Sequence, residues 1–344
     1  MRSLAPARTS WLPSDEDVAV CLPRRSLVRA RESAVRVLVT GAGGFVGRAL
    51  CALLKARGVA CRRAVRASAG TEGAEFIAVG DIGPKTDWST ALAGCSAVVH
   101  LANLAHVPAD SAELASVNVQ GTRRLAQQAS AAGVRRMIFM SSVKALCDES
   151  GGGPITESRV PEPTDDYGRA KLAAERALAE VAVKSGLETV ILRPPLVYGP
   201  GVRANFLALM RAVQYGLPIP IGTVRNRRSL IYVGNLAHAV LCCLEASEAM
   251  GKTYLVADGP PVSSPDLARA LAHALGRPQR LVGCPPRLLE LTGTLIGRGA
   301  EVRRLTRSLE LDDNAIRREL GWRPPYSFEQ GLRATAEWYR ARGS

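Results

Sequence analysis

A tyrosine and a lysine spaced four residues apart are the residues best suited to acid–base chemistry in this chain. Tyr167 and Lys171 stand at the start of a predicted helix, where this spacing places them on one face. A cation beside a phenol stabilises phenolate and lowers its pKa from about 10 toward neutrality, as a general acid or base requires. Only six of the 45 cationic residues are lysines, so a lysine here is informative. The spacing alone is equally typical of an exposed helical face.

A serine at the end of a predicted strand would complete this group. Ser142 follows the apolar run 137–141 and precedes Tyr167 by 25 residues. Parallel α/β sheets bind their ligands at the carboxyl ends of the strands, so Ser142 could hydrogen-bond the reacting oxygen beside Tyr167. A serine at a strand end is also a common turn cap, and that alternative is favoured for Ser142 taken alone.

A glycine-rich loop between a strand and a helix predicts a dinucleotide site. The strand 35–40 runs into three glycines at intervals of three, and a helix begins near Arg48. The first glycine permits the tight turn, the second lets the backbone approach a pyrophosphate, and the third lets helix and strand pack closely. Free amides at the helix N-terminus attract the phosphates. The residues expected to contact the cofactor here are Gly41, Gly44, Phe45, Val46 and Gly47.

The end of the second predicted strand favours NADP(H) over NAD(H), although NAD(H) remains possible. An acidic residue there would bind the free ribose 2′-hydroxyl of NAD, but this chain ends the strand with Arg66. Arg66 could bind a 2′-phosphate, or it could be one more surface arginine among 39. Asp81 and Ile82 follow the third strand. Asp81 could accept from the adenine amino group or cap the turn before Pro84.

Short apolar runs that alternate with helical stretches must position these residues. This alternation predicts an α/β fold, a doubly wound parallel sheet of the Rossmann type. The strands are expected at 35–40, 59–65, 75–79, 97–101, 137–141 and 189–192. We expect a cofactor domain at 34–195 and a smaller mixed α/β substrate lobe at 196–344, with helices at 264–275 and 327–340. Within that lobe, the segment 231–244 could return to the sheet.

Composition excludes several other classes of protein. The chain has 344 residues, 47% of them hydrophobic, and a net charge of +14. Arginine is spread along the sequence without a basic block and aromatics are few, so no nucleic-acid partner is expected. The eight cysteines form no CxxC pair and no Cys/His ligand spacing. We therefore expect a reducing cytoplasm and no metal site. The longest uncharged run, 88–109, is broken by Gly, Ser, Asn and Pro, which argues against a membrane span.

Two segments fit less easily into this plan. Residues 1–33 carry Pro, Ser and Arg without periodicity, and we interpret them as a disordered tail or as translated sequence upstream of the true start. Residues 287–298 are amphipathic enough to touch a membrane surface. Docking against the substrate lobe is the favoured role for that segment, because apolar stripes are usually buried within the protein.

Taken together, the motifs resemble the extended short-chain dehydrogenase/reductase superfamily, in particular its nucleotide-sugar epimerase/dehydratase branch. The resemblance spans roughly residues 35–340. It rests on the glycine loop, Ser142, the Tyr167/Lys171 pair and the runs 100–103, 118–122 and 192–200. It implies a nucleotide-sugar substrate and a homodimer. The further residues it implies are Leu101, Ala102, Asn118 and Pro194 at the cofactor, and Asn205 and Arg228 at the substrate diphosphate.

The resemblance leaves three reactions to compare. Dehydratases of this family follow the active-site hydroxyl residue with an Asp-Glu pair, whereas Val143 and Lys144 follow Ser142, so dehydration is disfavoured. Arg66 and an exchangeable NADPH favour reduction of a UDP-4-keto-6-deoxy-N-acetylhexosamine for surface polysaccharide. A UDP-hexose 4-epimerase with bound NAD is the main alternative. A non-catalytic NADP-binding regulator is a minor one, because it would not need all of Ser142, Tyr167 and Lys171.

Overall fold

A seven-stranded parallel sheet forms the centre of the molecule. This computed structural model describes residues 36–66, 75–104 and 110–342. The expectation for residues 1–33 lies outside the described residues. The strand order is β3-β2-β1-β4-β5-β6-β9. From β1 the chain first adds strands on one side and then, from β4 on, adds strands on the other side, which confirms the doubly wound fold. The strands are β1 (Arg36–Thr40), β2 (Ala60–Val65), β3 (Phe76–Ala78), β4 (Ala97–His100), β5 (Arg136–Met140), β6 (Glu188–Arg193) and β9 (Thr253–Leu255).

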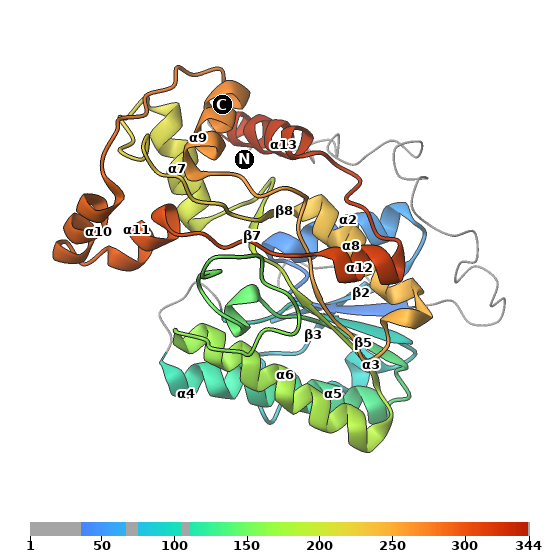
Figure 1. Cartoon of the computed structure of the whole chain (residues 1–344). Helices are drawn as coiled ribbons and strands as arrows, with labels where there is room; N and C mark the ends of the chain where they lie inside the picture. Colours follow the sequence, from blue (N-terminus) through green and yellow to red (C-terminus); the bar gives the residue numbers. More distant parts are fainter. Residues whose placement is uncertain (1–35, 67–74, 105–109, 343–344) are drawn as a thin grey trace.

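Helices cover both faces of this sheet (Figure 1). Successive side chains of a strand point to opposite faces, so Val37 and Val39 pack into one core and Leu38 into the other. The helices of the first face are α2 (Phe45–Ala56), α8 (Val233–Glu245) and α12 (Asn314–Leu320). Those of the second are α3 (Ser89–Leu92), α5 (Gly121–Ala131) and α6 (Asp166–Ser185). Burial on both faces explains the continuous apolar runs of central strands such as β4 and β5.

The later part of the chain returns to the sheet. α8 packs on α2 with its apolar residues buried, and β9 extends the sheet by pairing with β6. The strand β9 was missed by the sequence analysis because it is three residues long and lies in a Pro- and Gly-rich part of the chain. The division of the chain at residue 195 stays a prediction, and the structure adds that residues 233–255 belong to the sheet layer.

A second, smaller layer stands beyond the carboxyl edge of the sheet (Figure 1). Its two-stranded parallel sheet joins β7 (Leu196–Tyr198) to β8 (Leu230–Tyr232). Its helices are α7 (Ala204–Gln214), α9 (Ser264–Leu275), α10 (Pro286–Leu295), α11 (Gly299–Thr306) and α13 (Phe328–Ala341). α4 (Ser111–Leu114) and short helical turns η2 (Ala115–Gln120), η3 (Val143–Ala145) and η4 (Ser247–Ala249) complete the described elements. In the described ranges, every helix falls short of the length or apolar content that crossing a bilayer requires.

Asp258 ties the smaller layer to the sheet just after β9. Its carboxylate accepts hydrogen bonds from the Tyr198 hydroxyl at 2.9 Å, the Tyr232 amide at 2.8 Å and the Asn235 amide group at 2.7 Å. Burial raises the pKa of Asp258 to about 6. These donors come from β7, β8 and α8, so one buried carboxylate fixes how three elements meet.

Glu175 forms a second buried junction, between α6 and the centre of the sheet. Its carboxylate receives Arg193 Nε at 3.0 Å and Arg193 Nη2 at 2.5 Å, and it also accepts from the Ser141 hydroxyl. Both charged side chains are at most 9% exposed. A bidentate guanidinium–carboxylate pair is among the strongest polar contacts in proteins, provided that both partners are present.

We expect Glu175→Gln to lower the free energy of unfolding by about 3–5 kcal/mol, because it leaves the Arg193 guanidinium buried without its counter-charge. Glu180→Gln is the matched control, because Glu180 lies on the same helix and makes an exposed pair with Arg123. Urea unfolding followed by circular dichroism measures both variants. Equal midpoints for the two variants would contradict the importance of the buried pair.

Candidate active site

The glycine loop after β1 has the geometry of an anion-binding site. α2 begins at Phe45, and no side chain caps its N-terminus, so the amides of the first turn point toward the open edge. A Cβ at Gly47 would stand 2.2 Å from the Gly41 carbonyl oxygen, so only glycine allows α2 to approach the loop this closely. Phe45 and Val46 are half-buried in this first turn. These features fit the pyrophosphate of a dinucleotide.

A hydrogen-bonded chain missed by the sequence analysis joins the carboxyl ends of β1 and β4. Thr122 Oγ1 donates to the Asn118 carbonyl at 2.6 Å, so it accepts from His100 Nε2 at 3.0 Å. His100 Nδ1 in turn accepts from Thr40 Oγ1 at 2.7 Å. Thr40 Oγ1 also accepts from the amides of Leu101 and Ala102, each at 3.2 Å.

This series of hydrogen bonds requires a neutral imidazole at His100. His100 is fully enclosed, and burial lowers its pKa to about 3. The same hydrogen bonds hold the loop at Leu101 and Ala102 beside the glycine loop, as a cofactor lying across both strand ends would require. A polar residue at the last position of each strand, Thr40 and His100, is the signal that could have revealed it.

Asn118 acts on the next part of the same loop. Its Oδ1 accepts from the Leu104 amide at 2.8 Å and its Nδ2 donates to the Leu104 carbonyl at 3.1 Å. The side chain is 2% exposed. It lies in η2, whose wide π-type turn is a feature often found at functional sites. Asn118 therefore fixes the backbone at Leu104, and a contact of Asn118 with the cofactor stays a prediction.

Ser142 begins the turn η3 at the carboxyl end of β5. Its hydroxyl oxygen accepts from the Lys144 amide at 3.2 Å, so the turn-cap interpretation is correct for the oxygen. The hydroxyl proton remains able to donate to a ligand. The next amide, that of Val143, donates to the Pro194 carbonyl at 3.0 Å. The structure thus brings Pro194 beside the Ser142 turn, and its contact with the nicotinamide stays a prediction.

Tyr167 lies in the first turn of α6, next to this serine turn. A Cβ at Gly168 would stand 2.3 Å from the Lys144 carbonyl oxygen, so glycine after Tyr167 lets the helix press against η3. Asp165 caps α6 by accepting from the Gly168 amide at 2.8 Å. Lys171, one turn further, donates to the Met140 carbonyl at 2.8 Å. The three predicted catalytic residues therefore converge at one strand end.

The prediction that Lys171 lowers the pKa of the Tyr167 phenol is wrong for the protein without a bound ligand. Burial, and then the negative charge of Asp165, raise the pKa of Tyr167 instead of lowering it. Burial lowers the pKa of Lys171 to about 7, and Lys171 Nζ lies 5.9 Å from the centre of the Tyr167 ring. Lys171 is directed at Met140 and stacks over Phe139, with Nζ 4.8 Å from that ring centre, so it stands back from the phenol.

Lys144 links the Ser142 turn to the start of α6, a role that the sequence did not reveal. Its ammonium group contacts the Asp165 carboxylate and, at 3.0 Å, the Asp148 carboxylate. Asp165 is also the cap of the helix that carries Tyr167. The pair therefore ties the Ser142 turn to the start of α6 and offsets a negative charge that raises the phenol pKa.

The two residues predicted at the adenosine end lie together. Arg66 Nε is 3.7 Å from Asp81 Oδ1, with side chains 77% and 92% exposed. They follow the carboxyl ends of β2 and β3, the position of a ribose in dinucleotide folds. Ile82 packs instead against the core between the sheet and α5. Arg66 is thus partly balanced by an acid that the sequence analysis had considered separately.

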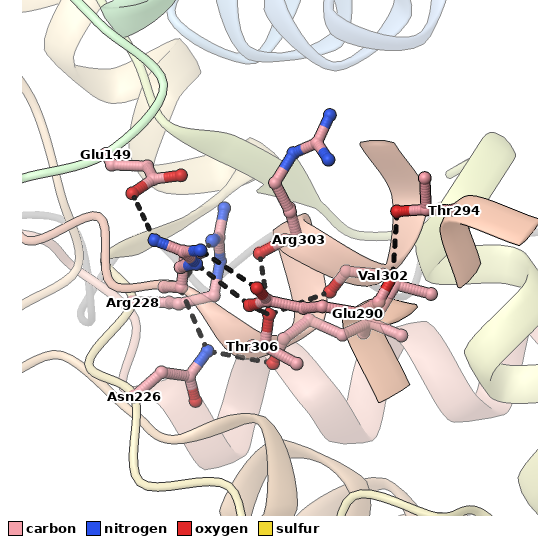
Figure 2. A network of polar contacts seen from close by, with 10 residues as sticks. Glu149, Asn226, Arg228, Glu290, Thr294, Val302, Arg303 and Thr306 are labelled. Atoms are coloured by element: carbon pink, nitrogen blue, oxygen red, sulfur yellow. Dashed lines mark hydrogen bonds and ion pairs between the residues drawn. The ribbon is translucent and has the colours of Figure 1, made fainter. Parts of the chain in front are cut away.

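The predicted substrate residues lie in different surroundings. Arg228 is mostly enclosed, and its Nη1 donates to the Arg307 carbonyl at 2.9 Å within the network of Figure 2. Burial and the charge of Arg304 lower the pKa of Arg228 to about 10. Asn205 is exposed in the first turn of α7, directly after Ala204, whose φ of 51° is strained for a residue with a side chain. Their contact with substrate stays a prediction.

Comparison with known proteins fits this geometry. A relative from Vibrio cholerae described as a UDP-glucose 4-epimerase is 38% identical over 309 residues, covering 88% of this chain and 94% of the relative. A ketoreductase from Stigmatella aurantiaca that acts on a farnesylated quinoline oxide is 28% identical, covering 87% and 95%. The solved structure of MoeE5 in complex with UDP-glucose and NAD superposes with a TM-score of 0.73 at 27% identity, covering 90% and 100%.

A family model agrees with these relatives. Residues 37–257 match the model of the NAD dependent epimerase/dehydratase family. The matched region runs from β1 through β9 and includes the glycine loop, Ser142, Tyr167 and Lys171. It also contains the edge strand that completes the sheet. The chain is an enzyme of the extended short-chain dehydrogenase/reductase type and belongs to the NAD dependent epimerase/dehydratase family.

Proposed function

We propose that the protein is a UDP-hexose 4-epimerase that works with NAD. The observation that carries the proposal is the tight union of the Ser142 turn with the Tyr167 helix, made by Gly168 and the Lys144–Asp165 pair. Two comparisons support the reaction and the ligands: the Vibrio cholerae relative is described as a UDP-glucose 4-epimerase, and MoeE5 was solved with UDP-glucose and NAD. Pro194 and the loop at Leu101 would border the nicotinamide.

The side chains of the site account for the proton transfers. When bound, NAD supplies a hydride acceptor and donor for C4 of the sugar. Tyr167, in its phenolate form, would take the proton from the C4 hydroxyl as that carbon is oxidised, and the resulting phenol would return it when the carbon is reduced from the other face. Ser142 donates a hydrogen bond to the same oxygen in both directions. Lys171, bound to the Met140 carbonyl, supplies a nearby cation when it is protonated.

Reduction of a UDP-4-keto-6-deoxy-N-acetylhexosamine is the second candidate, with a role in surface polysaccharide synthesis. Arg66 favours it, because the end of β2 offers no acid for a ribose diol and an exchangeable NADPH suits net reduction. The ketoreductase relative supports reductive chemistry on a related scaffold. Val143 and Lys144 after Ser142 provide no acid and base for eliminating water, so dehydration is not proposed.

The proposal includes a cytoplasmic homodimer. The long helices α5 and α6 lie side by side on the outer face of the sheet, away from the smaller layer (Figure 1). They present the surface that we expect a second copy to cover. In the part of the chain that the structure describes, none of the seven cysteines forms a disulfide.

The first experiment separates the two candidate reactions. Purified protein is incubated with UDP-glucose or UDP-N-acetylglucosamine without added cofactor, and the sugars are followed by proton NMR. We expect the galacto epimers to form, because an epimerase returns its hydride and consumes no cofactor. In parallel, UDP-4-keto-6-deoxy-N-acetylglucosamine is mixed anaerobically with NADPH or NADH, and absorbance of the reduced nicotinamide is recorded. Stoichiometric oxidation there, without epimer formation, would replace the epimerase by the reductase.

Replacing the phenol tests the proton transfer. We expect Tyr167→Phe to lower kcat by about 10²–10⁴-fold while cofactor binding stays intact, because only the acid–base hydroxyl is removed. Tyr215→Phe is the matched control, because Tyr215 is 75% exposed in the smaller layer. Turnover is measured by the NMR assay and cofactor binding by fluorescence titration. Unchanged turnover in Tyr167→Phe would contradict a proton-transfer role for this phenol, whereas cofactor binding without any turnover in the natural protein would favour the non-catalytic regulator.

Cofactor preference is tested at the end of β2. If Arg66 binds a 2′-phosphate, Arg66→Ala weakens NADPH binding by about 10–100-fold and leaves NADH binding unchanged, because a charge-assisted hydrogen bond is lost. Arg135→Ala is the control, an exposed arginine at the opposite end of the sheet. Equal effects on both cofactors would make Arg66 an ordinary surface residue and leave NAD as the cofactor.

A further inference from the structure

Helix α10 presents its apolar side to solvent. At 100° per residue, Leu288, Leu291 and Leu295 share one face, and they are 50%, 58% and 77% exposed. Ile296, just past the helix end, is 69% exposed. Within α10 only Gly293 is fully buried. Docking against the lobe, the role favoured from the sequence, therefore describes only the opposite side of this helix.

That opposite side is firmly held. Leu289 packs against the small core around Ile221, and a Cβ at Gly293 would stand 2.6 Å from the Val302 side chain, so α10 lies tightly on α11. Figure 2 shows the Glu290 side chain within a network of polar contacts that includes Thr306. Arg307 binds Glu290 through Nε and Nη2, each at 2.8 Å, and Glu149 at 3.3 Å. These contacts fix the leucine face outward.

Thr306 and Arg228 extend the same anchor. Thr306 Oγ1 donates to Glu290 Oε1 at 2.7 Å, and Arg228 donates to the Arg307 carbonyl (Figure 2). The Arg307 contact holds the pKa of Glu290 at about 2, so the pair persists over the physiological pH range. An apolar face held outward by an ionic anchor is built into the fold, because rotating the helix inward would break these bonds.

The charges around this face are positive. Residues 286–307 contain five arginines and two glutamates, and one of those glutamates, Glu290, is already paired with Arg307. Arg287, Arg298, Arg303 and Arg304 of the same hairpin are exposed. Exposed leucines and exposed arginines in one hairpin are the composition of helices that lie in the interface of an anionic membrane, where both the apolar and the charged groups find partners.

We propose that the α10–α11 hairpin is a peripheral docking surface for anionic lipid membranes. The hairpin projects from the smaller layer at the edge of the molecule, so a flat surface could reach it without obstruction (Figure 1). A second copy of the chain fits less well, because a symmetric pair would set the arginines of one copy against those of the other. The leucines would enter the headgroup boundary while the arginines bind lipid phosphates.

Vesicle flotation of the full chain tests this proposal without substrate or cofactor. The vesicles are phosphatidylcholine alone or phosphatidylcholine mixed with phosphatidylglycerol. We expect binding to the mixed vesicles only, weakened by salt. We expect Leu291→Ser/Leu295→Ser to lower that binding by at least about tenfold, because two apolar contacts with the acyl boundary are lost. Arg287→Glu/Arg298→Glu should lower it as well by reversing the attraction to phosphatidylglycerol.

Tyr215→Ser/Leu217→Ser is the matched control, because both residues are exposed apolar side chains of the same layer outside the hairpin. Circular dichroism confirms that each variant is folded, and light scattering gives its oligomeric state. No binding of the natural chain to mixed vesicles, or equal losses in the control, would overturn the proposal. A dimer that the leucine substitutions dissociate, without vesicle binding, would assign the face to a second copy. None of these outcomes bears on the epimerase proposal, because no substituted residue has been assigned to the active site.

Discussion

The geometry of the site depends on the contacts that the Glu175 carboxylate makes with Arg193 and Ser141. The carboxylate receives Arg193 from the end of β6 and Ser141 from the end of β5, while its own helix carries Tyr167 and Lys171. Each neighbour of these contacts has a predicted role: Ser142 follows Ser141, and Pro194 follows Arg193. One buried charge pair therefore sets the relative positions of the proton-transfer group and the residues expected beside the nicotinamide. Its desolvation cost is offset only when all partners are in place.

The loops predicted to hold the cofactor are fixed by neutral groups instead. His100 links Thr40 to Thr122, and its depressed pKa keeps the ring uncharged. A charged imidazole there would repel Lys171, whose charge already contributes to lowering the pKa of His100. The molecule thus places neutral hydrogen-bonded groups under the predicted cofactor loops and a charged junction under Ser142, Tyr167 and Lys171.

The sequence allowed the sheet and the central residues of the site to be predicted, because both depend on local patterns. Six strands were expected within a residue or two of their observed bounds. The glycine loop and Ser142 lie at strand ends, and Tyr167 lies at the start of a helix, as expected. Contacts between distant segments were missed. Lys144 and Asp165 are 21 residues apart and meet only after folding, and the partners of His100 come from two other elements. The raised Tyr167 pKa was also missed, since burial cannot be read from helix spacing.

The place of β9 in the sheet has a consequence for how the chain is made. Most of the cofactor-binding half comes first in the sequence. Its edge strand and one covering helix, however, come from residues 233–255, which follow β7, α7 and β8 of the smaller layer. During synthesis, the apolar side of α2 and the open edge of β6 must wait for that later segment. A nascent chain halted before β9 would carry every predicted catalytic residue and still lack a closed core. Such intermediates are the species that chaperones would be expected to recognise.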